Sequence, residues 1–370
     1  MVRSRRAAPL LAAAIGAALT LGACSSSSSS SSAASSSGAA PTSADVGAST
    51  TAAPSGAQVT LHLGYFPNLT HATALVGVHD GIFAKALGPN VKLVTTTFNA
   101  GPAEVQALFA GAIDAAYMGP SSAVTGFTQS GGAALEVVSG ATSGGAELVV
   151  KASITTVAQL KGAKLASPQL GNTQDVALRY WLSQQGFKTD TTGGGDVSIL
   201  PQANATAVTA FAAGAIDGGW LPEPYASQLV KEGGHVLVDE RTLWPGGKFA
   251  TTVLVVRKAF LSAHPDVVKA LLTGQLQAND FVNQNATQAQ SDASAEIATI
   301  TGKAPSASVV AAAWKELTFT DDPIASSIQA AADHAVSVGL GKKVSLTGLV
   351  DVTVLNQVLG AAGEPTVTAS

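Results

Sequence analysis

Apolar and polar positions repeat with two different periods along the chain, and each period predicts a different element. Val59, Leu61 and Leu63 alternate with polar residues as in a strand, whereas apolar positions three and four apart predict helices. Predicted strands and helices alternate from residue 58 onward, which is typical of an α/β fold with parallel sheets. Strands are predicted at 59–66, 91–98, 113–118, 135–140, 147–150, 196–200, 216–221, 236–239 and 251–256, helices at 70–86, 102–110 and 172–185, a short helix, turn and strand within 155–169, and a largely helical chain after 258.

One apolar stretch occurs twice. Residues 105–120 read VQALFAGAIDAAYMGP and residues 208–224 read VTAFAAGAIDGGWLPEP, which places Asp114 and Asp217 103 positions apart. Each copy predicts a helix, a glycine turn, a short strand and a Pro-marked loop that opens a new helix. In parallel α/β sheets such loops leave the carboxyl ends of strands, where ligands bind. The repeat therefore predicts two similar lobes with a binding cleft between them.

The lobes are predicted to be connected twice. We place the crossovers near residues 153 and 249, so that lobe 1 comprises 58–153 plus 249–370 and lobe 2, comprising 154–248, is inserted into it. Two connecting segments between lobes form a natural hinge.

The N-terminal residues have the pattern of an export signal. Arg3, Arg5 and Arg6 precede an apolar run over 10–21 that is short for a transmembrane helix. The sequence Leu-Gly-Ala-Cys at 21–24 resembles the lipobox of bacterial lipoproteins, which implies a signal peptide over 1–23 and a lipid on Cys24. The alternative is an ordinary secretory signal with an unrelated cysteine. Residues 24–57, mostly Ser and Ala, predict a disordered tether.

Charge and motifs exclude several function classes. Only 12% of residues are charged, and removal of the three arginines of the signal peptide changes the net charge from −4 to −7, which argues against nucleic-acid binding. A single cysteine permits no intrachain disulfide or thiolate metal cluster. The histidines lack metal-binding spacing, and the nucleophile-elbow, P-loop and zinc-protease motifs are absent. We therefore predict no catalytic residue, no metal and no cofactor.

Four loops at predicted helix starts carry the candidate chemistry: 64–71, 118–122, 168–175 and 220–225. Helix N-termini present unpaired N–H groups and partial positive charge, so several that converge form an anion site without Arg or Lys. The alternative is that these residues only cap their own helices. The candidate ligand-binding residues with neutral polar side chains are Asn68, Thr70, Ser121, Ser122, Ser143, Gln169, Asn172, Thr173 and Gln174.

Three further candidates have larger or charged side chains. Tyr65 and Trp220 could stack on a ligand or close over an apolar tail, or could pack in the core. Glu223 is unexpected in an anion site. It could hold a ligand ammonium group, pair with a base across the cleft, or cap its own helix.

From about Val59 onward the chain resembles the extracytoplasmic substrate-binding proteins of ABC importers, in particular the nitrate/sulfonate/taurine group of the aliphatic sulfonate-binding type. The resemblance rests on GYFPNLTHATALVG, FNAGPAEVQALFAGAIDAAYMGPSSA, GATSGGAELVV, LASPQLGNTQDVALRYWL, WLPEPYASQLV and FATTVLVV. It implies a two-lobed periplasmic-binding-protein fold of type II. It also implies a monomer, lipid-anchored at the outer face of the cell membrane, that delivers a small sulfonate-like anion to permease and ATPase subunits.

The resemblance leaves the ligand open, because the group also includes proteins for nitrate, bicarbonate, aromatic sulfonates and thiamine-precursor pyrimidines. Gln174 and Asp175 depart from the Ser/Thr-rich helix start of the family. An enzyme of pyrimidine synthesis on the same fold, or a sensor lipoprotein read by a membrane kinase, is also compatible with these residues. After processing, Cys24 and Met118 would hold the only sulfur atoms. This indicates either a sulfur-sparing protein with a sulfur-containing ligand or a genome with few methionines.

Overall fold

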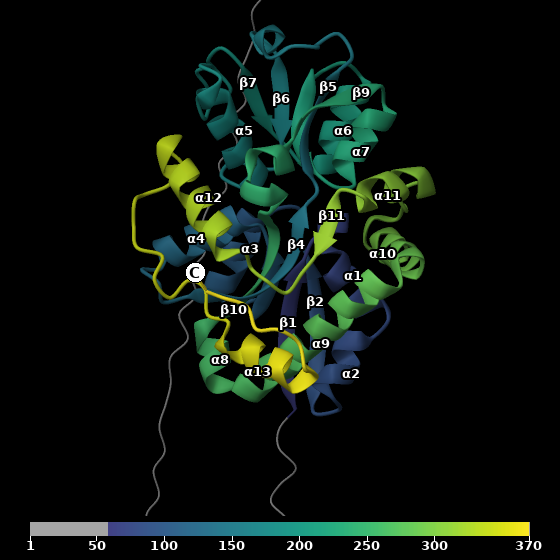
Figure 1. Ribbon diagram of the computed structural model, residues 1–370, viewed down its shortest axis with the longest axis vertical. Helices are drawn as coiled ribbons and strands as arrows, with labels where there is room; N and C mark the ends of the chain where they lie inside the picture. The colour runs from purple at the N-terminus through teal and green to yellow at the C-terminus, as the bar shows by residue number, and fades with distance from the viewer. Residues whose placement is uncertain (1–57, 370) are drawn as a thin grey trace, which may run out of the picture. The chain divides into compact units, whose positions relative to one another are not determined.

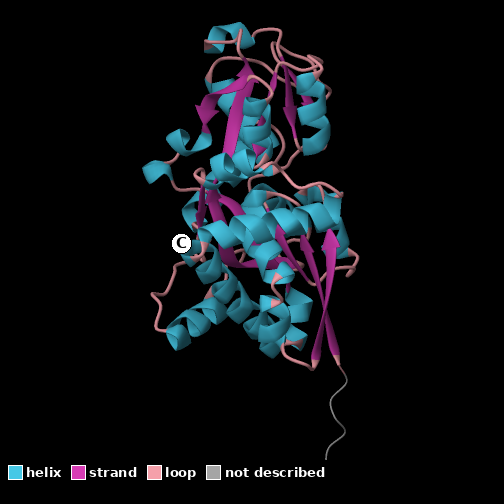
Figure 2. Ribbon diagram, turned by 90° about the vertical axis from the view of Figure 1, so that its right-hand side faces the viewer, coloured by secondary structure: helices cyan, strands magenta, loops and turns pink. Residues whose placement is uncertain are grey.

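The computed structural model describes residues 58–369, so the predicted signal peptide, Cys24 and the tether lie outside the described residues. Within this part of the chain, two mixed sheets are flanked by helices, which confirms the predicted α/β two-lobed fold (Figures 1 and 2). Every helix in the described part is too short or too polar to cross a membrane.

The first sheet has the strand order β11-β4-β10-β3-β1-β2. Strand β1 runs parallel to β2 and β3, whereas β10 is antiparallel to both β3 and β4. The strands are β1 (Val59–Tyr65), β2 (Val91–Thr97), β3 (Ala115–Met118), β4 (Leu135–Gly144), β10 (Ala250–Arg257) and β11 (Leu317–Phe319).

The second sheet has the strand order β7-β6-β8-β5-β9. Strand β6 is parallel to β7 and β8, and β5 is antiparallel to β8 and β9. The sheets, expected to be parallel, are therefore mixed, because β5 and β10 each enter their sheet from the other lobe and run antiparallel to their neighbours. The strands are β5 (Ala146–Lys151), β6 (Lys164–Ser167), β7 (Ser198–Pro201), β8 (Gly218–Pro222) and β9 (Gly234–Asp239).

The two sheets have equivalent topologies. The order β2-β1-β3-β10-β4 in one corresponds to β7-β6-β8-β5-β9 in the other, with parallel and antiparallel neighbours at the same places. Helices α3 (Gly101–Phe109) and α6 (Asn204–Ala212) begin and end at the offset of 103 found in the sequence. The repeated stretch is thus the shared helix and central strand of two equivalent lobes.

The repeated aspartates have equivalent structural roles. Asp114 accepts hydrogen bonds from the His62 N–H at 3.0 Å and from Arg257 at 2.7 Å. Asp217 accepts from the Lys164 N–H at 2.8 Å and pairs with Lys151. Each aspartate thus links the start of its own strand to the neighbouring parallel strand and to a basic residue on the neighbouring antiparallel strand.

The chain passes between the sheets at two places. Strand β4 ends at Gly144 and β5 begins at Ala146, so the first crossover lies at Gly145 rather than near residue 153. Residue 153 lies beyond the end of β5, and β5 is already a strand of the second sheet. The second crossover lies between β9 and β10, over residues 240–249. On this strand division we propose lobe 1 as 58–144 plus 250–369 and lobe 2 as 146–239.

The helices follow the predicted pattern with two differences. The helix predicted over 70–86 is interrupted at Gly81, where φ is +67°, a value that glycine adopts without strain. The predicted helical tail also contains β11. The remaining helices are η1 (Leu69–His71), α1 (Ala72–His79), α2 (Ile82–Leu87), α4 (Pro120–Gln129), η2 (Val157–Leu160), α5 (Thr173–Gln184), α7 (Tyr225–Lys231), η3 (Glu240–Leu243), η4 (Pro245–Gly247), α8 (Lys258–Ala263), α9 (Pro265–Gln284), α10 (Ala286–Thr301), α11 (Ala307–Trp314), α12 (Ala325–Ser337) and α13 (Thr353–Ala362).

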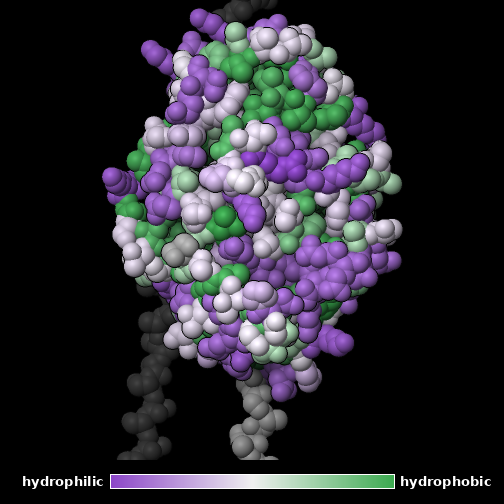
Figure 3. Space-filling model, in the orientation of Figure 1, coloured by the Kyte–Doolittle hydropathy of each residue, from purple (hydrophilic) through white to green (hydrophobic). Residues whose placement is uncertain are grey.

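Hydrophobic cores lie on both faces of each sheet. On β10, Val253 and Val255 join one cluster while Leu254 and Val256 join the cluster on the opposite face. This division follows from the two-residue period of a strand and explains why β10 is apolar throughout. On the molecular face drawn in Figure 3, polar and apolar residues are interspersed.

Candidate functional site

A small cavity lies between the lobes and is lined by residues of both. Its volume is about 20 Å³, which is room for about one water molecule. The lining residues are Phe66, Asn68, Thr70, His71, Asn99, Gly101, Gly119, Ser122, Pro168, Asn172, Thr173, Gln174, Asn204, Pro222 and Thr251.

Helices α4 and α5 face the cavity with their first turns. Gly119 is the N-cap of α4, and Ser122 follows in its first turn. Asn172 is the N-cap of α5, and its Oδ1 accepts a hydrogen bond from the Asp175 N–H at 2.9 Å. Asn172 thus caps its own helix, and the first N–H groups of α5 near the cavity remain without intrahelical partners.

The two repeat helices also begin at the cavity. Gly101 opens α3 and Asn204 opens α6, and both residues line the cavity. Among the described residues, four helices therefore direct their N-termini at one point: α3 and α4 from lobe 1, and α5 and α6 from lobe 2. Their summed partial positive charge favours an anion there.

The lining side chains carry no formal charge at neutral pH. None of them is Asp, Glu, Lys or Arg. Burial lowers the pKa of His71 to about 3, so the imidazole is neutral, and its Nδ1 accepts from the Phe66 N–H at 3.3 Å. The groups that this lining offers are thus helix ends, hydroxyls and amides.

Two carboxylates close to the cavity are already engaged. Asp175 accepts from Arg179 at 2.9 Å and from the Ser167 hydroxyl at 2.6 Å. Glu223, which is fully buried, accepts from the Ser227 N–H at 3.1 Å and from its hydroxyl at 2.8 Å. Burial raises the pKa of Glu223 to about 7. Of the roles considered for Glu223, the structure places it as a cap of α7.

Glu104 is a third buried carboxyl, on the first turn of α3. It is 0% exposed, and both of its oxygens lack a hydrogen-bond partner among the described residues. Burial raises its pKa well above the ordinary value and so favours the protonated form. A charged carboxylate here would oppose the anion-binding potential of α3, whereas the neutral acid does not.

The lobes touch each other around the cavity. The Ser121 N–H donates to the Thr173 hydroxyl at 3.3 Å, and the Leu69 N–H donates to the Glu223 carbonyl at 3.0 Å. On another side, the rings of Tyr180 and His334 stack with centroids 3.6 Å apart. These contacts join residues of lobe 2 to residues of lobe 1, so the structure has a closed cleft.

The cavity brings together six of the predicted ligand-binding residues: Asn68, Thr70, Ser122, Asn172, Thr173 and Gln174. Their contact with a ligand stays a prediction. All four predicted loops reach the cavity, the fourth through Pro222.

The remaining predicted residues lie elsewhere. Tyr65 is core, with its hydroxyl donating to Glu296 at 2.9 Å, and Trp220 is core, with its indole donating to Glu240 at 2.7 Å. Their large rings have no place at a cavity of this size and fill the lobe interiors instead. Ser143 accepts from the Phe249 N–H at 3.3 Å beside the crossover, Gln169 is half-buried outside the cavity lining, and Ser121 lines a neighbouring cavity with Trp244 and His334.

Several lining residues were not predicted. Gly101 and Asn204 sit at equivalent positions of the repeat, four residues before the stretch recognised in the sequence. The residues at 101–104, GPAE, and at 204–207, NATA, share no identity at the offset of 103, so the repeat carries no signal for them. Thr251, on β10, also could not be identified from the sequence. It lies at the cavity because the chain re-enters lobe 1 after lobe 2, which is a property of the tertiary fold.

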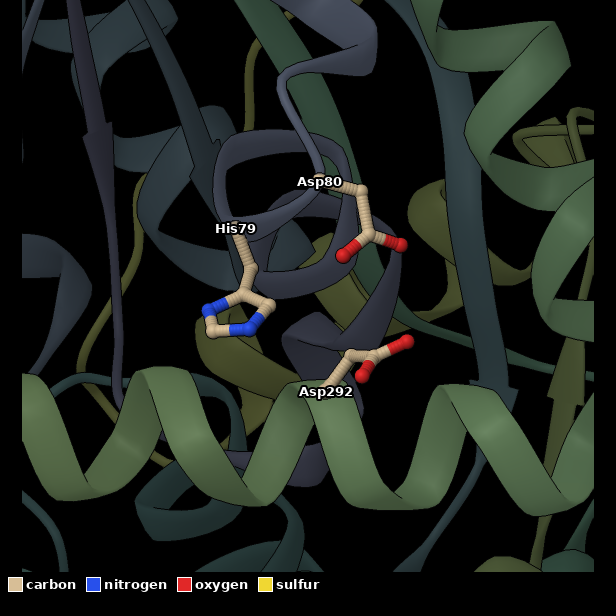
Figure 4. A group of neighbouring side chains, drawn as sticks. All are labelled: His79, Asp80 and Asp292. Carbon is tan, nitrogen blue, oxygen red and sulfur yellow. The ribbon is translucent and has the colours of Figure 1, made fainter.

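Within residues 58–369, two groups of side chains have a spacing that could hold a metal ion. His79, Asp80 and Asp292 lie at the end of α1 that is remote from the cavity, with donor atoms within 4.8 Å of one another (Figure 4). The second group, Glu147, Asp239 and Glu316, lies beside the crossovers. There Arg241 pairs with both Asp239 and Glu316 and supplies the positive charge.

Comparison with known proteins gives a consistent picture. The model of a family described as NMT1-like matches residues 55–299. The taurine-binding periplasmic protein of Escherichia coli is 29% identical over 208 residues, which are 55% of this chain and 61% of that protein. The chain thus spans about three fifths of the length of the curated relatives it matches first.

Solved structures share the fold. The alkanesulfonate-binding protein SsuA from Xanthomonas axonopodis pv. citri, bound to MOPS, superposes with a TM-score of 0.66 at 22% identity, covering 79% of this chain and 98% of that one. The periplasmic nitrate-binding protein NrtA from Synechocystis superposes with a TM-score of 0.69 at 18% identity, covering 83% and 90% of the two chains.

Proposed function

The chain belongs to the NMT1-like family, and from this membership and the cavity we propose that it is the substrate-binding component of an ABC importer. It captures a small organic oxyanion, of the aliphatic sulfonate type, in the cleft and delivers it to permease and ATPase subunits. It acts as a monomer and performs no chemical step.

The convergence of the N-termini of α3, α4, α5 and α6 on the cavity carries this proposal. Each helix end supplies N–H groups and a partial positive charge, which together bind an oxyanion without a basic side chain. Because two of the helices come from each lobe, only the closed form surrounds the anion completely. Binding therefore stabilises closure, and the crossovers at Gly145 and 240–249 serve as the hinge.

Three observations support a sulfonate as the ligand. The relatives and solved structures include proteins named for taurine and alkanesulfonate. The mature chain would contain almost no sulfur, as expected of a protein made when sulfur is scarce. The ligand's oxygens also match the hydroxyl and amide groups of Ser122, Thr173 and Asn204. The small volume of the cavity keeps nitrate and bicarbonate as competing ligands to test.

The proposed location is the outer face of the cell membrane, with Cys24 lipidated. Radiolabelled palmitate should enter the wild-type protein and not the Cys24→Ala variant. Equal labelling of both would contradict the anchor without affecting the binding proposal.

A thermal-shift screen tests the function. The panel contains ethanesulfonate, taurine, aromatic sulfonates, nitrate, sulfate, bicarbonate and a thiamine-precursor pyrimidine. A ligand at a hundredfold its Kd adds about 2.7 kcal/mol to the free energy of unfolding, which raises the Tm by roughly 5 °C. A shift with sulfonates supports the proposal. A shift with the pyrimidine alone rejects the anion argument, and nitrate or bicarbonate alone rejects the organic ligand.

A further inference from the structure

Among the described residues, those that line the cavity include no group that can neutralise a positive charge. Resting on the proposed function, we propose that the site selects sulfonates whose remaining atoms carry no positive charge, and rejects the zwitterionic aminosulfonates such as taurine. The substrate class is thereby narrowed to simple alkanesulfonates and their uncharged derivatives.

An ammonium group that enters a closed cleft loses its water shell, and this loss is compensated only when a carboxylate or a full set of acceptors replaces the water. Taurine carries its ammonium group only two carbon atoms from its sulfonate, so both charged groups meet the lining of the same cleft. The ammonium therefore depends on a carboxylate in or beside the lining.

Each nearby carboxyl group is unavailable for that role. Asp175 is buried in an ion pair with Arg179, with side-chain exposures of 0% and 2%. Glu223 is held by two hydrogen bonds to Ser227. Glu104 is not among the residues that line the cavity, and its Oε1 lies 2.9 Å from where a Cβ of Gly64 would be.

The potential of the cavity also disfavours a cation. The N-termini of α3, α4, α5 and α6 contribute partial positive charge from two sides, which attracts the sulfonate and repels an ammonium held close to it. Ser122 and Asn204, 1% and 5% exposed, each have a side-chain oxygen without a partner among the described residues. The Ser122 hydroxyl can donate to a sulfonate oxygen, whereas the Asn204 Oδ1 only accepts and can receive a hydrogen bond from a ligand hydroxyl.

Isothermal titration of the full chain with three ligands of similar size tests the proposal. Propanesulfonate places a methyl group where taurine has its ammonium, and isethionate places a hydroxyl there. We expect taurine to bind at least tenfold more weakly than both. Taurine binding as tightly as propanesulfonate, or more tightly, overturns the selectivity and leaves the proposed function intact. Failure of all three to bind overturns the proposed function and this proposal with it.

Two variants separate the cavity's charge from other causes. Asn204→Asp places a carboxylate in the lining and should shift the ratio of taurine to propanesulfonate affinity at least tenfold in favour of taurine. Glu223→Gln should leave the ratio of wild type unchanged, because Glu223 caps α7. Loss of taurine binding specifically in Glu223→Gln would show that this carboxylate turns into the cleft, which contradicts the proposal.

Discussion

Ser122 is the residue whose change separates binding from stability most clearly. Its hydroxyl oxygen lines the cavity and has no partner among the described residues, so the empty protein gains nothing from it. Ser122→Ala should weaken binding of a charged ligand by about 1.5–3 kcal/mol, or roughly 10- to 100-fold in Kd. The Tm of the unliganded variant should stay the same or rise slightly.

Thr252→Val provides a matched control for Ser122→Ala. The Thr252 hydroxyl is also buried and unpartnered among the described residues, but it is not part of the cavity lining. Its removal should leave the Kd unchanged. An equal loss of affinity in the two variants would contradict the role of Ser122.

Glu104 makes the stability of the protein depend on pH. Its pKa is raised by burial, so above about pH 4.5 the folded state retains a proton that the unfolded chain releases. This group therefore lowers stability as the pH rises, by up to about 1.4 kcal/mol per pH unit. Glu104→Gln removes the titration, so its free energy of unfolding in urea should fall less between pH 5 and pH 8 than that of wild type. If the free energy of unfolding changed equally with pH in wild type and in Glu104→Gln, the pH dependence assigned to Glu104 would be contradicted.

At the scale of elements, the hinge is organised around Arg241. This residue follows β9, pairs with Asp239 and reaches Glu316 before β11. Glu147 on β5 faces the same cluster, and burial, together with Glu223, Glu316 and Asp239, raises its pKa to about 8. Among the described residues, Arg241 thus provides the positive charge that pairs with the acidic residues beside the crossovers.

Replacement of this cation should destabilise the hinge in a pH-dependent way. Arg241→Gln should lower the free energy of unfolding by about 1 kcal/mol, since the ion pairs are partly exposed. Above about pH 8 Glu147 ionises and gains an attraction to Arg241 that the variant lacks, so the difference should grow between pH 6 and pH 9. Urea unfolding at pH 6 and pH 9 measures this difference in the free energy of unfolding. In a Glu147→Gln background, adding Arg241→Gln should lower the free energy of unfolding equally at both pH values.

Most elements were predictable because their apolar periods are local properties of the sequence. The strand starting at Val59 and the helix after Asn172 needed only alternation and a capping residue. The short β11 was missed because three residues carry no period, and its pairing with β4 lies far away in the sequence. The direction of β5 and β10 was also missed, because it depends on the order in which the chain visits the lobes.

The candidate site was predictable only where it followed helix starts. Asn172, Thr173 and Ser122 were found because turn chemistry and caps have sequence signatures. For Tyr65 and Trp220 the sequence left ligand contact and core packing open, because a large aromatic residue near a loop has the same signature in a core and in a cleft; both lie in a core. Asn99 and Thr251 reach the cavity through tertiary packing alone.

At the scale of the whole molecule, Gly119 lies where the lobes meet. A Cβ at this position would overlap the hydroxyl of Thr173 in the other lobe, although φ of −71° suits any residue. Gly119→Ala should therefore hinder closure without disturbing either lobe. We expect at least a tenfold rise in Kd and a larger radius of gyration in the presence of ligand by small-angle X-ray scattering.

Gly360→Ala is the control for Gly119→Ala. Gly360 lies on α13, and nothing lies within 4 Å of an added Cβ. The variant should bind like wild type and gain up to about 1 kcal/mol in stability from the better helix former. If Gly119→Ala binds its ligand with the Kd of wild type, the closed lobes accommodate the added methyl group, which contradicts the prediction.

The scarcity of sulfur is a property of the whole chain and predicts how it is expressed. If the composition reflects sulfur sparing, the protein should be several-fold more abundant in sulfur-limited than in sulfur-replete cells, as measured by quantitative proteomics. Unchanged abundance would favour a general paucity of methionine in the genome.

The insertion of one lobe into the other also fixes the order in which the emerging chain can fold. Residues 58–144 are synthesised first, but the first sheet has β10 between β3 and β4, and β10 follows the whole of lobe 2. Lobe 2 is continuous in sequence and has all its strands once β9 has emerged, so it can complete its sheet earlier. The N-terminal segment must stay incomplete until then, with β3 and β4 lacking their central neighbour. Of the two segments that form lobe 1, the one that emerges first is therefore the one that depends longest on protection from aggregation.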